Sequence, residues 1–161
     1  MKKFFVILLL LITTSCGFKP MFSSADTDIY VTPISGINGI DLRNALWARF
    51  GGQRESGATY TLNVKLNEPV TQYKALEQTG DATWQEISLT ASYTLLHGQE
   101  QIANGKEHAA ESYTFVRYLV ASNASYNNAV QNAIRVLAEK ISARAIAETY
   151  KHSHEDLGIN K

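Results

Sequence analysis

Residues 82–115 read "ATWQEISLTASYTLLHGQEQIANGKEHAAESYTF", and this stretch decides the fold because it predicts a long β-hairpin. Apolar and polar residues alternate in its first half, which is typical of a strand with one buried face. The apolar positions of that half are Ile87, Leu89, Ala91, Tyr93 and Leu95. The letters "HGQE" at 97–100 predict the turn. On the return strand we expect a bulge or kink at Asn104 and Gly105.

Two more strands are predicted before this hairpin. Residues 58–68, "ATYTLNVKLNE", alternate with period two and predict a half-buried strand. Residues 28–34, "DIYVTPI", are β-branched and aromatic and stop at Pro33, which favours a first or edge strand. Residues 69–80, "PVTQYKALEQTG", have no sustained period, so we expect a long connection there.

Two segments have the periodicity of amphipathic helices. In residues 41–52, "DLRNALWARFGG", Asp41 stands at the expected N-cap, Leu42, Leu46 and Phe50 follow at spacing four, and two glycines end the pattern. A longer helix is predicted over residues 122–151, with its cap among residues 122–125. Its stripe recurs at spacings of three and four through Tyr126, Val130, Ile134, Leu137, Ile141, Ala145 and Glu148.

The predicted order is therefore strand, helix, strand, strand, strand, helix (β-α-β-β-β-α). We expect an α+β fold, in which two helices pack on one face of a mostly antiparallel four-stranded sheet. The other face would carry Thr, Ser, Asn, Glu and Lys. We place a single domain at residues 28–151, a tether at 16–27 and a polar C-terminal tail at 152–161.

The N-terminus has the layout of a secretory signal peptide over residues 1–15. Lys2 and Lys3 precede nine apolar residues, "FFVILLLLI", and then small polar residues. This apolar run is shorter than the roughly 20 residues of a membrane span, although a short transmembrane stub is the alternative. Cys16 follows where cleavage is expected, as in the lipobox of bacterial lipoproteins, with Ser15 acceptable and Thr13 replacing the usual Leu. We expect Cys16 to be the lipid attachment site, because two or three acyl chains anchor a protein firmly.

Composition excludes several classes of function. Cys16 is the only cysteine, so once it is acylated the domain has no disulfide available. Without Lys2 and Lys3 the charge balance is 13 minus 15, or −2, which gives no basic excess for nucleic acid. His152 and His154 provide only two ligands, whereas zinc sites use three or four. We therefore expect these histidines to lie in a solvated tail. No Gly-x-Ser-x-Gly elbow or Walker loop is present, so we expect neither an enzyme nor a cofactor.

Several segments together resemble the lipopolysaccharide-assembly lipoproteins, the LptE family, in their shorter alphaproteobacterial form. "CGFKPMF" at 16–22 looks like the family's mature start, with Met21 where Leu is common. "DLRNALWARFGG" resembles its first helix, and residues 82–115 look like its central hairpin. The long alanine-rich final helix also fits. The resemblance covers nearly all of the mature chain.

This resemblance implies a lipid-anchored protein on the periplasmic side of the outer membrane. It would occupy and plug the lumen of the translocon β-barrel LptD and assist lipopolysaccharide assembly. Because lipopolysaccharide carries phosphates, we take Lys65, Lys74 and Arg117 as candidate contacts, with ordinary solvated charges as the alternative. A second hypothesis is a periplasmic lipoprotein that is accessory to an inner-membrane lipid transporter. An enzyme is the third, and a polar sheet face that only meets solvent also fits the pattern.

Overall fold

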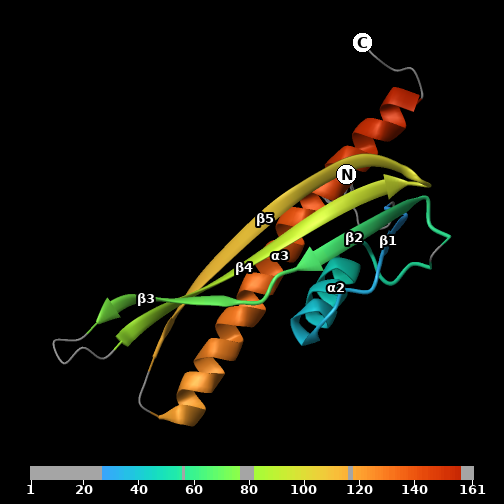
Figure 1. Cartoon of the computed structure of the whole chain (residues 1–161). Coiled ribbons are helices and arrows are strands. Elements are labelled where there is room, and N and C mark those ends of the chain that lie inside the picture. The colour runs from blue at the N-terminus through green and yellow to red at the C-terminus, as the bar shows by residue number, and fades with distance from the viewer. Residues whose placement is uncertain (1–26, 56, 77–81, 116–117, 157–161) are drawn as a thin grey trace, which may run out of the picture.

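The computed structural model describes residues 27–55, 57–76, 82–115 and 118–156 of the chain. These ranges contain five strands and two helices, and they confirm the predicted α+β class (Figure 1). In chain order the elements are β1 (Ile29–Val31), α2 (Ile37–Arg49), β2 (Tyr60–Leu66), β3 (Val70–Leu76), β4 (Ala82–His97), β5 (Glu100–Thr114) and α3 (Leu119–Asp156).

Strand β4 organises the sheet because it is paired along both of its edges. β5 runs antiparallel to it along nearly its whole length on one side. On the other side, β3 pairs with the first half of β4 and β2 with the second half, both antiparallel. β1 joins the outer edge of β2 in parallel orientation. The sheet is therefore mixed, with β1 as the edge strand that the sequence predicted.

The fifth strand, β3, corrects our expectation of a long connection over residues 69–80. β3 is held to β4 by backbone pairing, with an irregular register between Tyr73 and Leu76. Its Val70 and Tyr73 are 54% and 70% exposed. A strand that does not bury one face has no reason to alternate apolar and polar residues. The predicted four-stranded sheet was thus one strand short.

The β4–β5 hairpin forms as predicted, but its irregularity lies elsewhere. His97 pairs with Glu100 around Gly98, whose φ of 60° allows a tight two-residue turn. The register shifts where Ile102 forms an extra residue between the pairs Leu95↔Ala103 and Leu96↔Gln101. The expected bulge at Asn104 and Gly105 is therefore wrong.

Gly105 has a different role, because it pairs directly with Tyr93 and the tyrosine ring lies over it. A Cβ atom at residue 105 would be 2.6 Å from the Tyr93 hydroxyl oxygen and 2.7 Å from its Cζ. The absence of a side chain at Gly105 therefore makes room for an aromatic ring.

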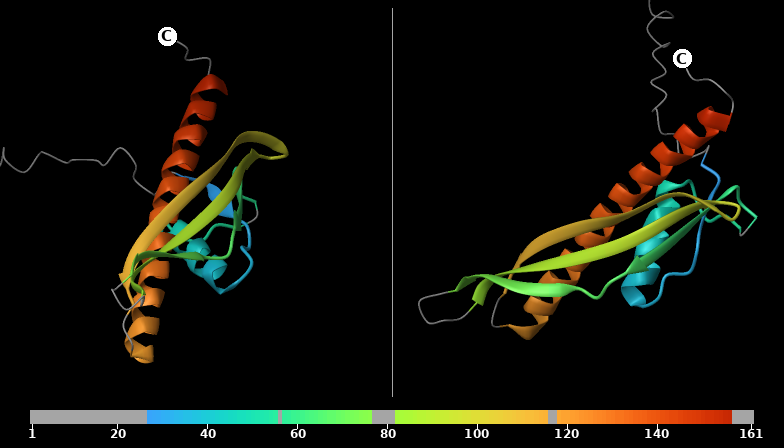
Figure 2. Two further views of the ribbon diagram at one scale, coloured as in Figure 1. Left: turned by 60° about the vertical axis from the view of Figure 1, so that its left-hand side comes forward. Right: turned by 45° about the horizontal axis from the view of Figure 1, so that its top comes forward.

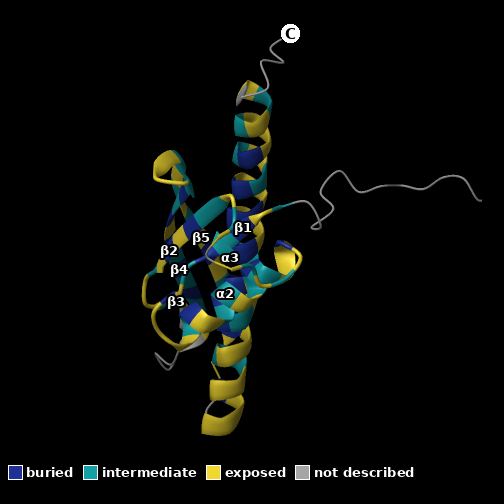
Figure 3. Cartoon of the chain, turned by 90° about the vertical axis from the view of Figure 1, so that its right-hand side faces the viewer, coloured by how far each residue is buried: buried dark blue, intermediate teal, exposed yellow. Residues whose placement is uncertain are grey.

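Both helices pack against the same face of the sheet, as Figure 2 shows from two sides. The predicted stripe of α2 is confirmed, since Leu42, Leu46 and Phe50 are fully buried. The stripe of α3 is confirmed from Val130 to Ala145, and its end turns are mostly exposed (Figure 3). On the sheet, the alternating residues of β4 that were predicted to be buried complete the core.

Both helices begin earlier than expected. α2 starts at Ile37, and Asp41 lies inside it, where its carboxylate accepts a hydrogen bond of 2.6 Å from Gln131 Nε2 of α3. α3 starts at Leu119 and continues to Asp156, so residues 152–156 are helical instead of belonging to a tail. Ile37 and Leu119 are 82% and 74% exposed. The first turns were missed because their apolar residues do not continue the buried stripes.

Candidate functional site

The face of the sheet away from the helices is the candidate site, and we call it the open face. Successive side chains of a strand point to opposite sides, so the pairing register assigns its members on β2 to β5. They are Thr61, Asn63, Lys65, Val70, Gln72, Lys74, Trp84, Glu86, Ser88, Thr90, Ser92, Thr94, Leu96, Gln101, Asn104, Lys106, His108, Ala110, Ser112 and Thr114. Lys74 lies at the register shift of β3 and is assigned by its ion pair with Glu86. Most of these side chains are polar. In Figure 1 this side of the sheet faces the viewer and α3 runs behind it.

Hydroxyl, amide and amino groups form rows across three strands at the centre of the open face. Lys65 of β2 pairs with Ser92 of β4, which in turn pairs with Lys106 of β5. We call Lys65, Ser92 and Lys106 the lysine row. The next row consists of Asn63, Thr94 and Asn104. On the other side of the lysine row, Thr90 Oγ1 lies 3.4 Å from His108 Nδ1.

The open face is more positively charged than the whole chain. It carries three lysines and one glutamate, 3 minus 1 or +2 with histidine neutral, whereas the chain has a formal net charge of +0. The glutamate, Glu86, forms an ion pair of 2.9 Å with Lys74. Lys65 and Lys106 are exposed and form no ion pair with any described residue. The two lysines of the row therefore carry the uncompensated charge.

The predicted contact residues have different positions. Lys65 lies on the polar side of β2, as expected, whereas Lys74 lies in β3 instead of a loop and is paired with Glu86. Arg117 and Cys16 lie outside the described residues. Sequence reasoning missed Lys106. The alternation of β5 gave a signal, but only the register shows that Lys106 lies in the same row as Lys65.

Two of the histidines, His97 and His152, lie together at the turn end of the sheet. The rings of His97 and His152 have centroids 4.7 Å apart, and Tyr60 lies 5.3 Å from His97. His152 thus packs α3 against the end of β4 and is not part of a solvated tail. Within the described ranges, no group of three or more His, Cys, Asp or Glu side chains is arranged to hold a metal ion.

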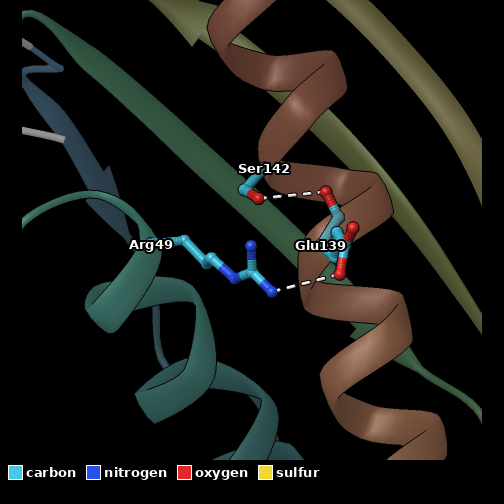
Figure 4. A network of polar contacts seen from close by, with 3 residues as sticks. All are labelled: Arg49, Glu139 and Ser142. Carbon is cyan, nitrogen blue, oxygen red and sulfur yellow. Dashed lines mark hydrogen bonds and ion pairs between the residues drawn. The ribbon is translucent and has the colours of Figure 1, made fainter. Parts of the chain in front are cut away.

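An ion pair on the opposite side of the molecule joins the two helices. Arg49 of α2 pairs with Glu139 of α3 at 3.1 Å, and Ser142 Oγ donates to the Glu139 carbonyl oxygen at 3.0 Å (Figure 4). The two charged side chains are 48% and 65% exposed, so the pair contributes at most about 1 kcal/mol. The same three residues line a shallow hollow of about 250 Å³.

Three shifted pKa values in the described part of the chain have structural causes. Burial raises the pKa of Tyr93, and the charge of Glu107 adds to the effect. Burial also raises the pKa of Tyr113, whose hydroxyl donates to the buried Gln85. The pKa of Asp28 is lowered by hydrogen bonds from the backbone N–H and the hydroxyl of Thr59, each 2.8 Å long.

A second exposed feature is apolar and lies at the end of the molecule where α3 begins. Trp84 of β4 pairs with Thr114, next to Phe115, and these two aromatic residues are 51% and 42% exposed. Leu119 and Val120 in the first turn of α3 are 74% and 83% exposed. Exposed large apolar side chains that form a contiguous patch are typical of contact surfaces.

Comparison with solved structures shows the fold. A lipoprotein of Caulobacter crescentus is similar at 19% identity, with a TM-score of 0.61, covering 76% of this chain and 89% of that chain. Rare lipoprotein B of Shewanella oneidensis is similar at 16% identity, also with a TM-score of 0.61, covering 80% and 99%. A Xanthomonas campestris protein of the family DUF330 is similar at 11% identity, with a TM-score of 0.62, covering 84% and 92%. No family model and no curated protein sequence matches the chain.

The chain therefore has a fold that is found in bacterial lipoproteins. The similarity extends over nearly the full length of each solved structure, so it concerns the complete arrangement of sheet and helices. Of the helices within the described ranges, neither is long and apolar enough to cross a membrane.

Proposed function

We propose that this chain is an outer-membrane lipoprotein, anchored through Cys16 on the periplasmic side, that plugs the lumen of the translocon β-barrel LptD and assists lipopolysaccharide assembly. The observation that carries the proposal is the open face. It is polar, its central lysines are uncompensated, and neither helix covers it. The lumen of an outer-membrane barrel is itself polar and can be plugged by another structural element.

The resemblance of the sequence and the similarity of the fold support the same proposal from two sides. "CGFKPMF" at residues 16–22 resembles the mature start of the LptE family, and the solved structures of similar fold include rare lipoprotein B. The exposed apolar end, with Trp84, Phe115 and the first turn of α3, adds a second surface for a partner. The role that we propose is binding and assembly, without catalysis.

Protease digestion of outer membranes tests the plug. A chain inside a barrel would bury well over about 1,000 Å² and be shielded from protease. We expect resistance in membranes from wild-type cells and rapid cleavage when the barrel protein is depleted. Equal cleavage rates in the two samples would refute the plug.

The second candidate function is an accessory lipoprotein of an inner-membrane lipid transporter. The similarity of fold to a DUF330 protein, with the highest TM-score of the three structures described above, shows that this arrangement of elements is not confined to rare lipoprotein B. Density-gradient fractionation separates the two candidates. The barrel partner would be found with the outer membrane, and a transporter accessory would be found with the inner membrane.

A further inference from the structure

We propose that the open face binds an acidic protein surface, and that the lysine row of Lys65, Ser92 and Lys106 lies at the centre of this contact. The inference rests on the proposed function, which supplies the barrel protein as the partner. It adds the chemistry of the partner's surface, which must present carboxylate side chains opposite the row.

The register places the two lysines on one side of the sheet with a serine between them. Because neighbouring strands are about 4.8 Å apart, the Cα atoms of Lys65 and Lys106 are separated by about 10 Å. Two long lysine side chains at this spacing can converge on one carboxylate or bind two neighbouring ones. The Ser92 hydroxyl between them can donate a further hydrogen bond.

The charges on the open face indicate the sign of the charge on the partner's surface. Along β4, the nearest open-face carboxylate is Glu86, six residues from Ser92, and it is already paired with Lys74. The acidic residue next to the row, Glu107, belongs to the other side of β5 and pairs with Arg144 of α3 at 3.6 Å. If an interface buries Lys65 and Lys106, their charges need new partners, because an unpaired buried charge is strongly unfavourable. Carboxylates of the partner would supply them.

The shape of the surface favours a protein over a small ligand. Ligand sites are concave and hold about 300–1,000 Å³. The hollow that includes Lys65 lies at the β1 edge, holds about 180 Å³ and is lined by neither Ser92 nor Lys106. The row of Asn63, Thr94 and Asn104 beside the lysines provides amide and hydroxyl groups, which suit the hydrogen bonds that protein interfaces form about once per 100–200 Å².

Charge reversal with a matched control tests the inference. The variant Lys65→Glu with Lys106→Glu changes the net charge by four units on the open face. The control, Arg135→Glu with Lys151→Glu, makes the same change on exposed residues of α3. Each tagged, lipidated full-length chain is purified from its own cells in mild detergent, and the recovered barrel protein is quantified at low and high salt. Binding of purified lipopolysaccharide is measured in parallel.

We expect the reversed variant to recover at least tenfold less barrel protein than wild type and the control to recover a normal amount. Recovery by wild type should also fall with salt, because exposed charges are screened. If wild type recovers the barrel and the reversed variant recovers as much, the inference is overturned and the proposed function stands. If wild type recovers no barrel protein, the proposed function itself fails.

Two further results are decisive. Loss of lipopolysaccharide binding with normal recovery of the barrel would overturn the inference and assign the row to an anionic glycolipid. Equal thermal unfolding midpoints of variant and wild type establish that both are folded. If the reversed variant is unfolded, Lys65→Gln with Lys106→Gln takes its place. This double glutamine variant should recover several-fold less barrel protein than wild type. Recovery equal to that of wild type would overturn the inference.

Discussion

The contact between Tyr93 and Gly105 gives a sharp test of the packing in the β4–β5 hairpin. In Gly105→Ala the new Cβ atom would lie 2.6, 2.7 and 2.8 Å from three atoms of the Tyr93 side chain. Real Cβ atoms do not approach so closely, so the ring must move. Tyr93 is only 7% exposed, and movement of its ring disturbs the core around it.

The magnitude follows from two opposing effects. Overpacking of a buried site costs about 1–3 kcal/mol. Replacing glycine by alanine in a strand stabilises the folded state by roughly 0.5–1 kcal/mol, because the unfolded chain has less conformational freedom. We therefore expect Gly105→Ala to lower the free energy of unfolding by about 1 kcal/mol, within a range of about 0–2.5 kcal/mol. Gly57→Ala is the matched control, since no atom lies within 4 Å of its added Cβ, and it should leave stability unchanged or slightly higher.

Urea denaturation of the chain from Gly17 onward, followed by circular dichroism, measures both variants. A double-mutant cycle with Tyr93→Leu isolates the contact, because the shortened side chain leaves room at residue 105. In the Tyr93→Leu background, Gly105→Ala should be neutral or stabilising. If Gly105→Ala costs the same with tyrosine or leucine at position 93, or if it is as harmless as Gly57→Ala, the ring is not what requires glycine.

Three other predictions concern the core, the β1 edge and the anchor. Leu137 is fully buried at the centre of α3, so Leu137→Ala should lower the free energy of unfolding by about 2–5 kcal/mol, and an unchanged denaturation midpoint would contradict its packing on the sheet. Because the pKa of Asp28 is lowered in the folded state, the ionised carboxylate stabilises the fold above a pH of about 4, and this stabilisation is lost as the pH falls through the folded-state pKa. The difference in stability between wild type and Asp28→Ala should therefore shrink in acid. A difference that does not change with pH would contradict the role of the hydrogen bonds from Thr59. Cys16→Ala should leave the protein uncleaved or released into the periplasm, whereas retention in salt-washed outer membranes lacking the barrel would exclude a lipid anchor.

The elements that the sequence predicted well are those whose periodicity is enforced by burial. β4 and α3 alternate or recur because one side of each packs in the core, and Ile87 and Leu137 are fully buried. Residues 70–74 of β3, for which burial is described, are all exposed, so this part of the strand has no alternation that a sequence could show. The first turns of α2 and α3 lie outside the core stripes, and their starts were predicted four and three residues too late.

The lysine row could not be predicted, because it depends on the pairing of strands. The extra residue at Ile102 shifts the register of β5 by one position. Without it, Lys106 would lie opposite Ala91 and point toward the helices, since a one-residue slip turns every side chain to the other side. Alternation shows that a strand has a polar side, whereas only the register shows which polar residues meet.

The position of α3 after all five strands in chain order has a consequence for how the protein folds. The β4–β5 hairpin closes through a two-residue turn, so its contacts are local in sequence and can form early. Its apolar side, with Leu89 and Leu95, is covered only when α3 has docked. Between these two events the hairpin exposes the apolar surface that binds chaperones or aggregates. A slow-docking variant of α3 should therefore lower the yield of folded protein more than its equilibrium stability indicates.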